Sequence, residues 1–225
     1  GYSLGVYDYS SRAMETAAAA GATAMSSADE VIAYSDEVFT SLPTPEVVTS
    51  FWQENAPSMN SSTIAVDTST VDPRTSRHVE SLIKAQGARF VAATVGKTPA
   101  HAEVGEVPFF VGGDVDAKKE VMPILEAISS DTFDMGTVEG ATIFKLISNL
   151  VGMTNLVALA EGYAMAKSKG ISDESFDKAL RTTGAWSVQA DMRLPLMIAD
   201  EYSTKFAVDL AAKDIRLSID AAARD

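Results

Sequence analysis

Apolar and polar residues follow two different patterns along the chain. In the first part, short β-type runs alternate with amphipathic stretches, which is typical of parallel βαβ units. These runs predict strands at residues 4–9, 37–42, 63–67, 89–95, 107–112 and 132–135. Start signals for helices stand between them at Ser10 or Ser11, Ser27 with Glu30 in a capping box, Pro45, Asp72 with Pro73, and Asp114.

After residue 137 the pattern is helical only. One long helix is expected to run to Lys169 and to stop at Gly170, and the remaining helices are expected at 173–183, 187–198 and 206–223. This change in pattern predicts an α/β domain over 1–137 and an all-α domain over 138–225.

Composition narrows the class of partner. The chain has 46% hydrophobic and 22% charged residues, as expected of a folded globular protein, and its net charge is -13. We therefore expect neither nucleic acid nor an anionic membrane surface as a partner. Cysteine is absent from the sequence, which suits a reducing compartment and favours a cytoplasmic location.

The long helix raises the question of Lys145. From Ala141 to Met165 nearly every residue is apolar or small, so we expect a helix buried on all sides. Because that stretch also contains Lys145 and Asn149, we interpret it as a core helix rather than a membrane span.

Lys145 and Asn149 are four residues apart, and Gly152 continues the same stripe. An amine and an amide would then lie side by side near a glycine that leaves room for a small molecule. A lysine beside apolar surface could donate and accept a proton near neutral pH. The alternative is a lysine whose side chain reaches solvent from the first turn.

Asp8 stands at the carboxyl end of the first predicted strand. An acidic residue there can bind the adenosine ribose of a dinucleotide, or it can cap the following helix. The glycine-rich phosphate loop would lie roughly 20 residues earlier. Only seven residues precede Asp8, so either the chain is a fragment or the nucleotide interpretation is wrong.

Three strand ends carry polar loops, at residues 40–45, 67–73 and 93–99. They could line a cofactor crevice at the carboxyl edge of a sheet, although turn chemistry selects the same residue types. Within GKTPAH (96–101) the Gly-Lys-Thr is not a P-loop, because Val91 takes the place of the first glycine. His78 and His101 lack partners at metal-ligand spacing, so we assign no metal site.

Six stretches together resemble the β-hydroxyacid dehydrogenase family, the group of 3-hydroxyisobutyrate dehydrogenase and tartronate semialdehyde reductase. They are VYDYSSRAME, VFTSLPTPEVV, IAVDTSTVDPRTS, FVAATVGKTPAHAEVGEVPFFVGGD, KLISN and FAVDLAAKDIRL. The resemblance covers nearly the whole chain. It implies a Rossmann-type NAD(P) domain, then a long interdomain helix and an all-helical domain.

The resemblance also implies the chemistry, which is hydride transfer between the nicotinamide and a small β-hydroxy acid. Lys145 would relay a proton to or from the substrate hydroxyl, and Asn149 would orient that hydroxyl. Lys213, beside Asp214, would help close the site. Leu42, Pro43 and Thr70 would contact the cofactor, and Asp8 would contact its ribose, which favours NAD over NADP.

The chain departs from the family pattern in the substrate segment. Where the family reads D-A-P-V-S-G-G, this chain reads AATVGKT, so Gly96 replaces a serine and Lys97 and Thr98 replace two glycines. Lys97 could supply charge to the substrate carboxylate instead. The glycines expected four and six residues before Lys145 are Ala141 and Glu139, with Gly140 displaced by one.

Relative to the family, we expect truncation at both ends. The first strand, the phosphate loop and the first helix are missing, and the chain stops inside the helical domain, which would weaken cofactor binding. Two alternatives stay open: a non-catalytic nucleotide-binding or scaffold protein of the same fold, and an imine reductase. The long apolar helix further predicts a homodimer or a higher homo-oligomer.

Overall fold

The computed structural model describes residues 2–223. The chain divides into two compact units, Gly1–Lys145 and Leu146–Asp225. The boundary falls inside the long helix α7 (Val138–Ser168). Each unit is built around its own buried side chains, so the two are described in turn.

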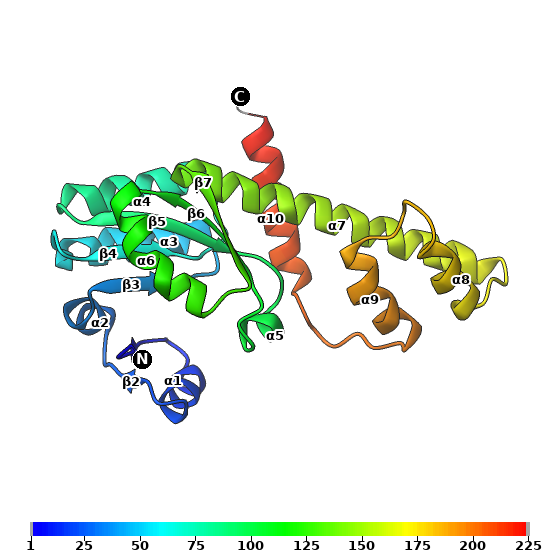
Figure 1. The fold of residues 1–225 in the computed structure, drawn as a ribbon, viewed down its shortest axis with the longest axis horizontal. Helices are drawn as coiled ribbons and strands as arrows, with labels where there is room; N and C mark the ends of the chain where they lie inside the picture. Colours follow the sequence, from blue (N-terminus) through cyan, green and yellow to red (C-terminus); the bar gives the residue numbers. More distant parts are fainter. Residues whose placement is uncertain (1, 224–225) are drawn as a thin grey trace. The chain divides into compact units, whose positions relative to one another are not determined.

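A five-stranded sheet forms the centre of the first unit (Figure 1). Its strands are β3 (Glu37–Thr40), β4 (Ile64–Asp67), β5 (Arg89–Val95), β6 (Pro108–Gly113) and β7 (Asp131–Gly136), paired in that order. β3, β4 and β5 run parallel, and β6 runs antiparallel to β5 but parallel to β7. The α/β fold expected from the alternating pattern is therefore confirmed, and the carboxyl ends of β3, β4 and β5 share one edge.

Helices cover both faces of this sheet. The chain order gives α2 (Ala28–Tyr34), α3 (Pro45–Asn55), the short η1 (Ala56–Ser58), α4 (Pro73–Ala85), α5 (Pro99–Ala102) and α6 (Val115–Ala127). Alternate residues of the strands serve the two faces: Phe90 packs in a core with Trp52 of α3 and Val79 of α4, whereas Val91 packs with Val121 of α6. Burial on both faces of the sheet explains why β4 and β5 read as nearly continuous apolar runs.

The helix starts lie where the sequence predicts them. Asp72 accepts hydrogen bonds from the amides of Arg74 and Thr75, and Asp114 caps α6 in the same way. Ser10 caps α1 (Ser11–Ala19). The capping box at α2 is only partly as predicted, because Ser27 accepts from the Glu30 amide but the Glu30 carboxylate accepts from Ser26 instead.

The first predicted strand, at 4–9, is wrong in extent. Only β1 (Gly5–Val6) pairs, with the unpredicted β2 (Thr23–Ala24), in a separate two-stranded sheet. Leu4 and Tyr9 are exposed, so no buried face extends the strand. The exposed two-residue β2 carries no periodic signal that a sequence pattern could reveal.

Two glycines near the start of α7 allow close approaches of the backbone. A Cβ atom on Gly112 of β6 would lie 1.9 Å from the Thr137 carbonyl oxygen, and one on Gly140 would lie 2.2 Å from that of Met135. Both distances are far inside van der Waals contact. Glycine is therefore required at both positions for β6, β7 and α7 to meet as they do.

The second unit is all helical, with the rest of α7, α8 (Asp173–Leu180), α9 (Val188–Ile198) and α10 (Val208–Ala222). Gly170 ends α7 with a positive φ of 76°. The core of this unit is small: Leu159, Ala190 and Leu194 are buried, and Phe176 and Trp186 pack against them.

The expectation that α7 is buried on all sides is wrong. Only 17% of its most apolar stretch is buried, and its exposed apolar side chains include Phe144, Ile147, Val151, Val157 and Met165. By length and composition alone α7 could cross a membrane, a test that core helices of soluble proteins also pass.

Candidate active site

A buried aspartate organises the carboxyl edge of the sheet. Asp67, the last residue of β4, is 3% exposed, and its Oδ1 accepts from the hydroxyls of Thr40 at 2.8 Å and Ser69 at 2.6 Å. The Ser69 amide also donates to it, at 3.3 Å. Burial raises the pKa of the Asp67 carboxyl, and these hydrogen bonds oppose that rise.

The predicted cofactor residues lie in the loops that this network holds. The Leu42 amide donates to the Ser69 hydroxyl at 2.9 Å, which joins the loop after β3 to the loop after β4. Leu42 and Thr70 are half-buried and Pro43 is exposed. An apolar side chain, a proline and a hydroxyl at the carboxyl edge of parallel strands fit one side of a dinucleotide.

Asp8 is exposed and follows β1 by two residues. Its Oδ1 accepts from the Ser10 amide at 2.7 Å, while Ser10 itself is the N-cap of α1. Asp8 therefore stabilises the turn before the helix rather than capping it. Its place at the carboxyl end of a parallel strand is the one that a ribose-binding acid takes.

The substrate segment after β5 differs from the family pattern for visible reasons. A Cβ on the buried Gly96 would lie 2.8 Å from Cγ of Pro108, so the proline ring fills the space of the expected serine side chain. Lys97 has a φ of 62°, in the left-handed region that favours glycine. Its Nζ donates to the Glu106 carbonyl at 2.7 Å, and the hydroxyl of Thr98 contacts Nδ1 of His101 at 2.7 Å.

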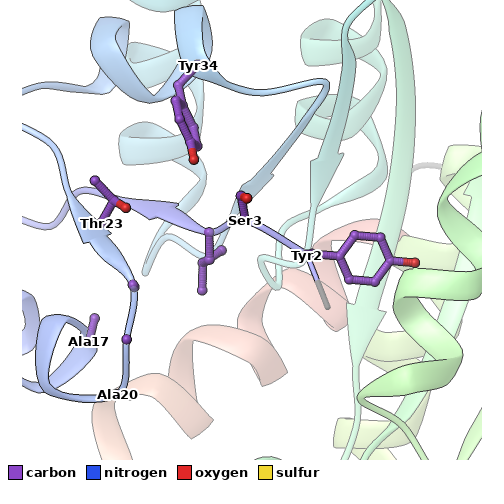
Figure 2. A pocket seen from close by; sticks show the side chains of 9 residues that line it. Tyr2, Ser3, Ala17, Ala20, Thr23 and Tyr34 are labelled. Atoms are coloured by element: carbon purple, nitrogen blue, oxygen red, sulfur yellow. The ribbon is translucent and has the colours of Figure 1, made fainter.

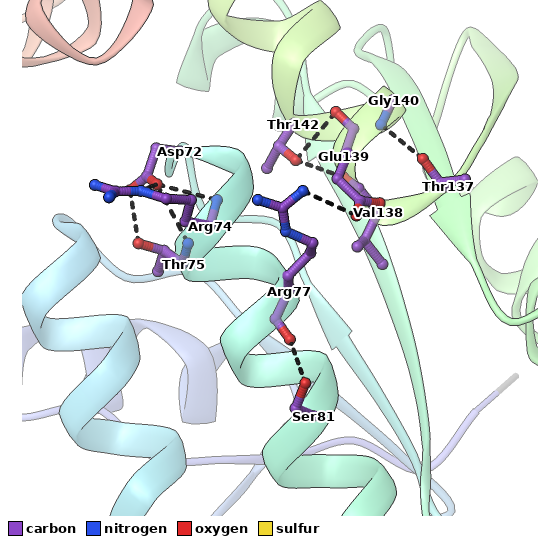
Figure 3. A network of polar contacts seen from close by, with 10 residues as sticks. All are labelled: Asp72, Arg74, Thr75, Arg77, Ser81, Thr137, Val138, Glu139, Gly140 and Thr142. Atoms are coloured by element: carbon purple, nitrogen blue, oxygen red, sulfur yellow. Dashed lines mark hydrogen bonds and ion pairs between the residues drawn. The ribbon is translucent and has the colours of Figure 1, made fainter. Parts of the chain in front are cut away.

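The first turn of α7 is fixed by contacts within the first unit. Figure 3 shows the Arg77 guanidinium of α4 reaching the Glu139 carboxylate, 3.4 Å away. The Thr137 hydroxyl accepts from the Gly140 amide. Thr94, at the end of β5, donates from its buried hydroxyl to the Ala141 carbonyl at 3.0 Å.

These contacts lead directly to Lys145, the last residue of the first unit. The residue is 8% exposed, so the alternative in which its side chain reaches solvent does not hold. Asn149 follows four residues later on the same helix, and this spacing keeps both residues on one helical face.

In the second unit Asp214 joins two of the predicted site residues. The Asn149 amide donates to Asp214 Oδ2 at 2.6 Å, and Lys213 Nζ lies 3.1 Å from Asp214 Oδ1. Asp214 is buried, and the Ser218 hydroxyl fastens the same turn of α10 to the Leu146 carbonyl at 3.2 Å. The space expected beside Gly152 is taken by the Gln189 amide, 3.2 Å from a Cβ built there, so that expectation is wrong.

One cavity of about 520 Å³ lies elsewhere in the first unit (Figure 2). Ser3, Leu4 and Thr23 line it, together with Tyr34. Ser3 and Leu4 precede β1 and Thr23 begins β2, so the cavity is at the amino ends of these two strands, opposite to the edge where ligands bind parallel sheets. Within residues 2–223, no group of three or more His, Cys, Asp or Glu residues could hold a metal.

Sequence reasoning missed three polar residues that hold the candidates in place. Asp67 and Ser69 carry the loop after β3, and Thr94 bonds the start of α7. Their only signal was a polar residue at or after the end of an apolar strand. Asp214 was noticed beside Lys213, but its bond to Asn149 joins residues 65 apart in sequence and cannot be read from spacing.

Nearly all of this chain matches models of known protein families. Residues 1–137 match a family model described as the NAD binding domain of 6-phosphogluconate dehydrogenase. Residues 140–225 match one described as the NAD-binding of NADP-dependent 3-hydroxyisobutyrate dehydrogenase. The chain belongs to the β-hydroxyacid dehydrogenase family. It is an NAD(P)-dependent oxidoreductase.

Individual relatives agree with this membership. The chain is 29% identical over 224 residues to a probable 3-hydroxyisobutyrate dehydrogenase of Mycobacterium bovis, covering 96% of this chain and 76% of that protein. It is 26% identical over 232 residues to the NAD-dependent L-serine dehydrogenase of Pseudomonas aeruginosa, covering 99% and 78%. The solved structure of Mycobacterium tuberculosis 3-hydroxyisobutyrate dehydrogenase with L-serine superposes with a TM-score of 0.90 at 26% identity, over 99% of this chain and 79% of that one. The predicted two-domain fold of this family is thereby confirmed.

Proposed function

We propose that this member of the β-hydroxyacid dehydrogenase family oxidises a small β-hydroxy acid, or reduces the corresponding carbonyl compound, with Lys145 as the general acid and base. The observation that carries the proposal is a buried lysine on α7 whose helix start is fixed by Thr94 and Arg77. The names of the relatives support hydroxy acids such as 3-hydroxyisobutyrate and L-serine as the substrate class.

The roles of the residues follow from their chemistry. A bound nicotinamide supplies or accepts the hydride. Lys145, which is buried on α7, then holds the proton that moves to or from the substrate oxygen. Asn149, oriented by Asp214, offers its amide to the same oxygen, and Asp214 also pairs with Lys213.

For the cofactor we propose contacts with Leu42, Pro43 and Thr70, and a ribose contact with Asp8 that prefers NAD. An exposed carboxylate at the carboxyl end of β1 repels a 2′-phosphate and accepts hydrogen bonds from a ribose. Replacing Asp8 by Ser should shift the ratio of kcat/KM for NAD and NADP toward NADP. An unchanged ratio would show that Asp8 does not contact the cofactor ribose.

For the substrate we propose contacts with Gly96, Lys97 and Thr98, in addition to Asn149. The Pro108 ring over Gly96 supports a pocket of different shape from that of relatives with a serine there. We further propose that residues 1–137 form the cofactor domain and 138–225 the substrate and dimerisation domain, in agreement with the limits of the two family matches.

The test of the catalytic role is the turnover of Lys145→Met. Methionine keeps the volume of the buried side chain, so the fold should persist while the proton donor is lost. We expect kcat on 3-hydroxyisobutyrate or L-serine to fall roughly 10²- to 10⁴-fold, with cofactor affinity unchanged. Lys119→Ala, on the exposed part of α6, serves as the control. Turnover within a few-fold of the parent protein would disprove the role of Lys145.

We also propose a homodimer in the cytoplasm. The exposed apolar side chains of α7, such as Ile147, Val151 and Val157, form a face that a second copy would cover. Light scattering of the purified protein should give twice the chain mass. The substitution Val151→Glu, which places a charge on this face, should lower the measured mass. A parent protein that is folded and monomeric would contradict the proposed dimer.

A further inference from the structure

The carboxylate of Asp67 lies where the loops to which we assign cofactor contacts leave β3 and β4. Asp67 ends β4 in register with Thr40, the last residue of β3. Its Oδ1 accepts both neighbouring hydroxyls, from Thr40 and Ser69, at 2.8 and 2.6 Å. The donors come from the end of β3 and from the loop after β4. Burying this carboxylate, which is 3% exposed, is costly, and the hydrogen bonds that offset the cost also fix the geometry of the strand end and the loop.

The two hydroxyls play unequal parts. Ser69 passes the contact on, because its oxygen also accepts the Leu42 amide at 2.9 Å. The result is a continuous chain from the Leu42 amide through the Ser69 hydroxyl to the Asp67 carboxylate. Thr40 ends its branch at Asp67, and its carbonyl is held separately by the Thr68 amide and hydroxyl, both at 2.8 Å.

We infer that Asp67 is a positioning residue for dinucleotide binding, and that it acts through Ser69 on the backbone at Leu42. This inference rests on the proposed cofactor contacts of Leu42, Pro43 and Thr70. The hydrogen bond to Asp67 Oδ1 fixes the position of the Ser69 hydroxyl. That hydroxyl in turn fixes the backbone at Leu42, and so the side chains of the loop after β3. The neighbouring Thr70 is placed by the same turn, since Ser69 bonds to Asp67 through both its amide and its hydroxyl.

The inequality of the two hydroxyls provides the test. Ser69→Ala removes the link to Leu42, whereas Thr40→Val removes a hydrogen bond of similar length from the same carboxylate and leaves the link intact. We expect Ser69→Ala to raise the Kd for NADH about 10-fold, as loss of one hydrogen-bonded restraint allows, and Thr40→Val to leave it within about 2-fold. Both should lower the Tm by similar amounts.

Variants of Asp67 complete the experiment. Asp67→Asn keeps an oxygen at Oδ1, so it should retain most of the affinity for NADH, while Asp67→Ala should resemble Ser69→Ala. The affinity loss should appear in the KM for cofactor and much less in kcat at saturating cofactor. Equal Kd values for Ser69→Ala and Thr40→Val, at equal Tm, would overturn the inference and leave the proposed function standing. A parent protein that binds neither NADH nor NADPH would overturn both.

Discussion

The hydroxyl of Thr94 donates to the carbonyl of Ala141 at 3.0 Å. That carbonyl is four residues before Lys145, so it is also the acceptor of the Lys145 amide within α7. The end of β5 is thereby fastened to the turn that carries the proposed catalytic lysine. Thr94 occupies the place of the proline in the family's D-A-P-V-S-G-G segment, and proline could not make this bond.

Replacing Thr94 by Val should show the value of this bond. Valine keeps the shape but leaves the Ala141 carbonyl with one donor fewer in a buried site, which should cost about 1–2 kcal/mol of unfolding free energy. Because the bond fixes the helix under Lys145, kcat should fall several-fold as well. Urea denaturation and steady-state kinetics measure the two effects. Thr94→Ser, which keeps the hydroxyl, is the control and should preserve kcat.

The serine of related proteins should not be tolerated at Gly96 while Pro108 remains. A serine Cβ would meet the proline ring at 2.8 Å, so we expect Gly96→Ser to cost about 1–3 kcal/mol. In a Pro108→Ala background the same change should cost clearly less. A double-mutant cycle measured by urea denaturation gives the coupling energy, and additive costs would show that the ring does not limit this position.

Lys97 has a φ of 62°, a left-handed conformation that favours glycine. The stabilities of Lys97→Ala and Lys97→Gly should therefore be compared. Both variants lose the hydrogen bond to the Glu106 carbonyl, so they differ only in backbone preference. At an ordinary loop residue the glycine variant is the less stable of the two. Here we expect it to be more stable than the alanine variant by about 1 kcal/mol. The opposite order in thermal unfolding would contradict the assigned backbone conformation.

The ion pair between Lys118 and Asp134 should give an acid dependence of stability. Lys118 Nζ donates to Asp134 Oδ1 at 2.6 Å, and this bond lowers the pKa of the Asp134 carboxyl. Since the folded value lies below the unfolded value of about 3.9, the stabilisation is complete above about pH 5. This stabilisation is lost as the pH falls from about 5 through the unfolded pKa toward the lower pKa of Asp134 in the folded protein.

Asp134→Asn should remove this part of the pH dependence. The ion pair contributes only about 1 kcal/mol or less to the free energy of unfolding, because the Asp134 side chain is 58% exposed and screened by solvent. Urea denaturation of both proteins between pH 3 and pH 7 measures it. Parallel stability curves for the parent and the variant over this range would exclude the linkage.

Local signals predicted most of the fold. Strong N-caps such as Asp72 and Asp114 placed helix starts correctly, because a cap depends only on residues within one turn. The reversal of β6 and the short β2 could not be predicted, because pairing partners depend on contacts far apart in sequence. The burial of α7 was overestimated for a similar reason: an apolar stripe indicates a face that needs cover, but does not say where the cover comes from.

The candidate site was predictable to the extent that it follows helix spacing. Lys145 and Asn149 are one turn apart on a single helix, so periodicity identified them together. The bonds from Thr94 to Ala141 and from Asn149 to Asp214 join distant segments and are visible only in three dimensions. Gly152 shows the limit of the spacing argument, since an empty position on one helix was filled by Gln189 of another.

The close approaches at Gly112 and Gly140 affect how a library of random variants of this protein should be interpreted. Every substitution at either position adds a Cβ that overlaps a backbone oxygen, at 1.9 Å from Thr137 and 2.2 Å from Met135. Such variants would score as inactive, and the place of Gly140 on the same helix as Lys145 would invite a catalytic explanation. A parallel screen for soluble expression would separate the two groups, because the glycine variants lose activity by misfolding and the Lys145 variants by loss of the proposed proton transfer.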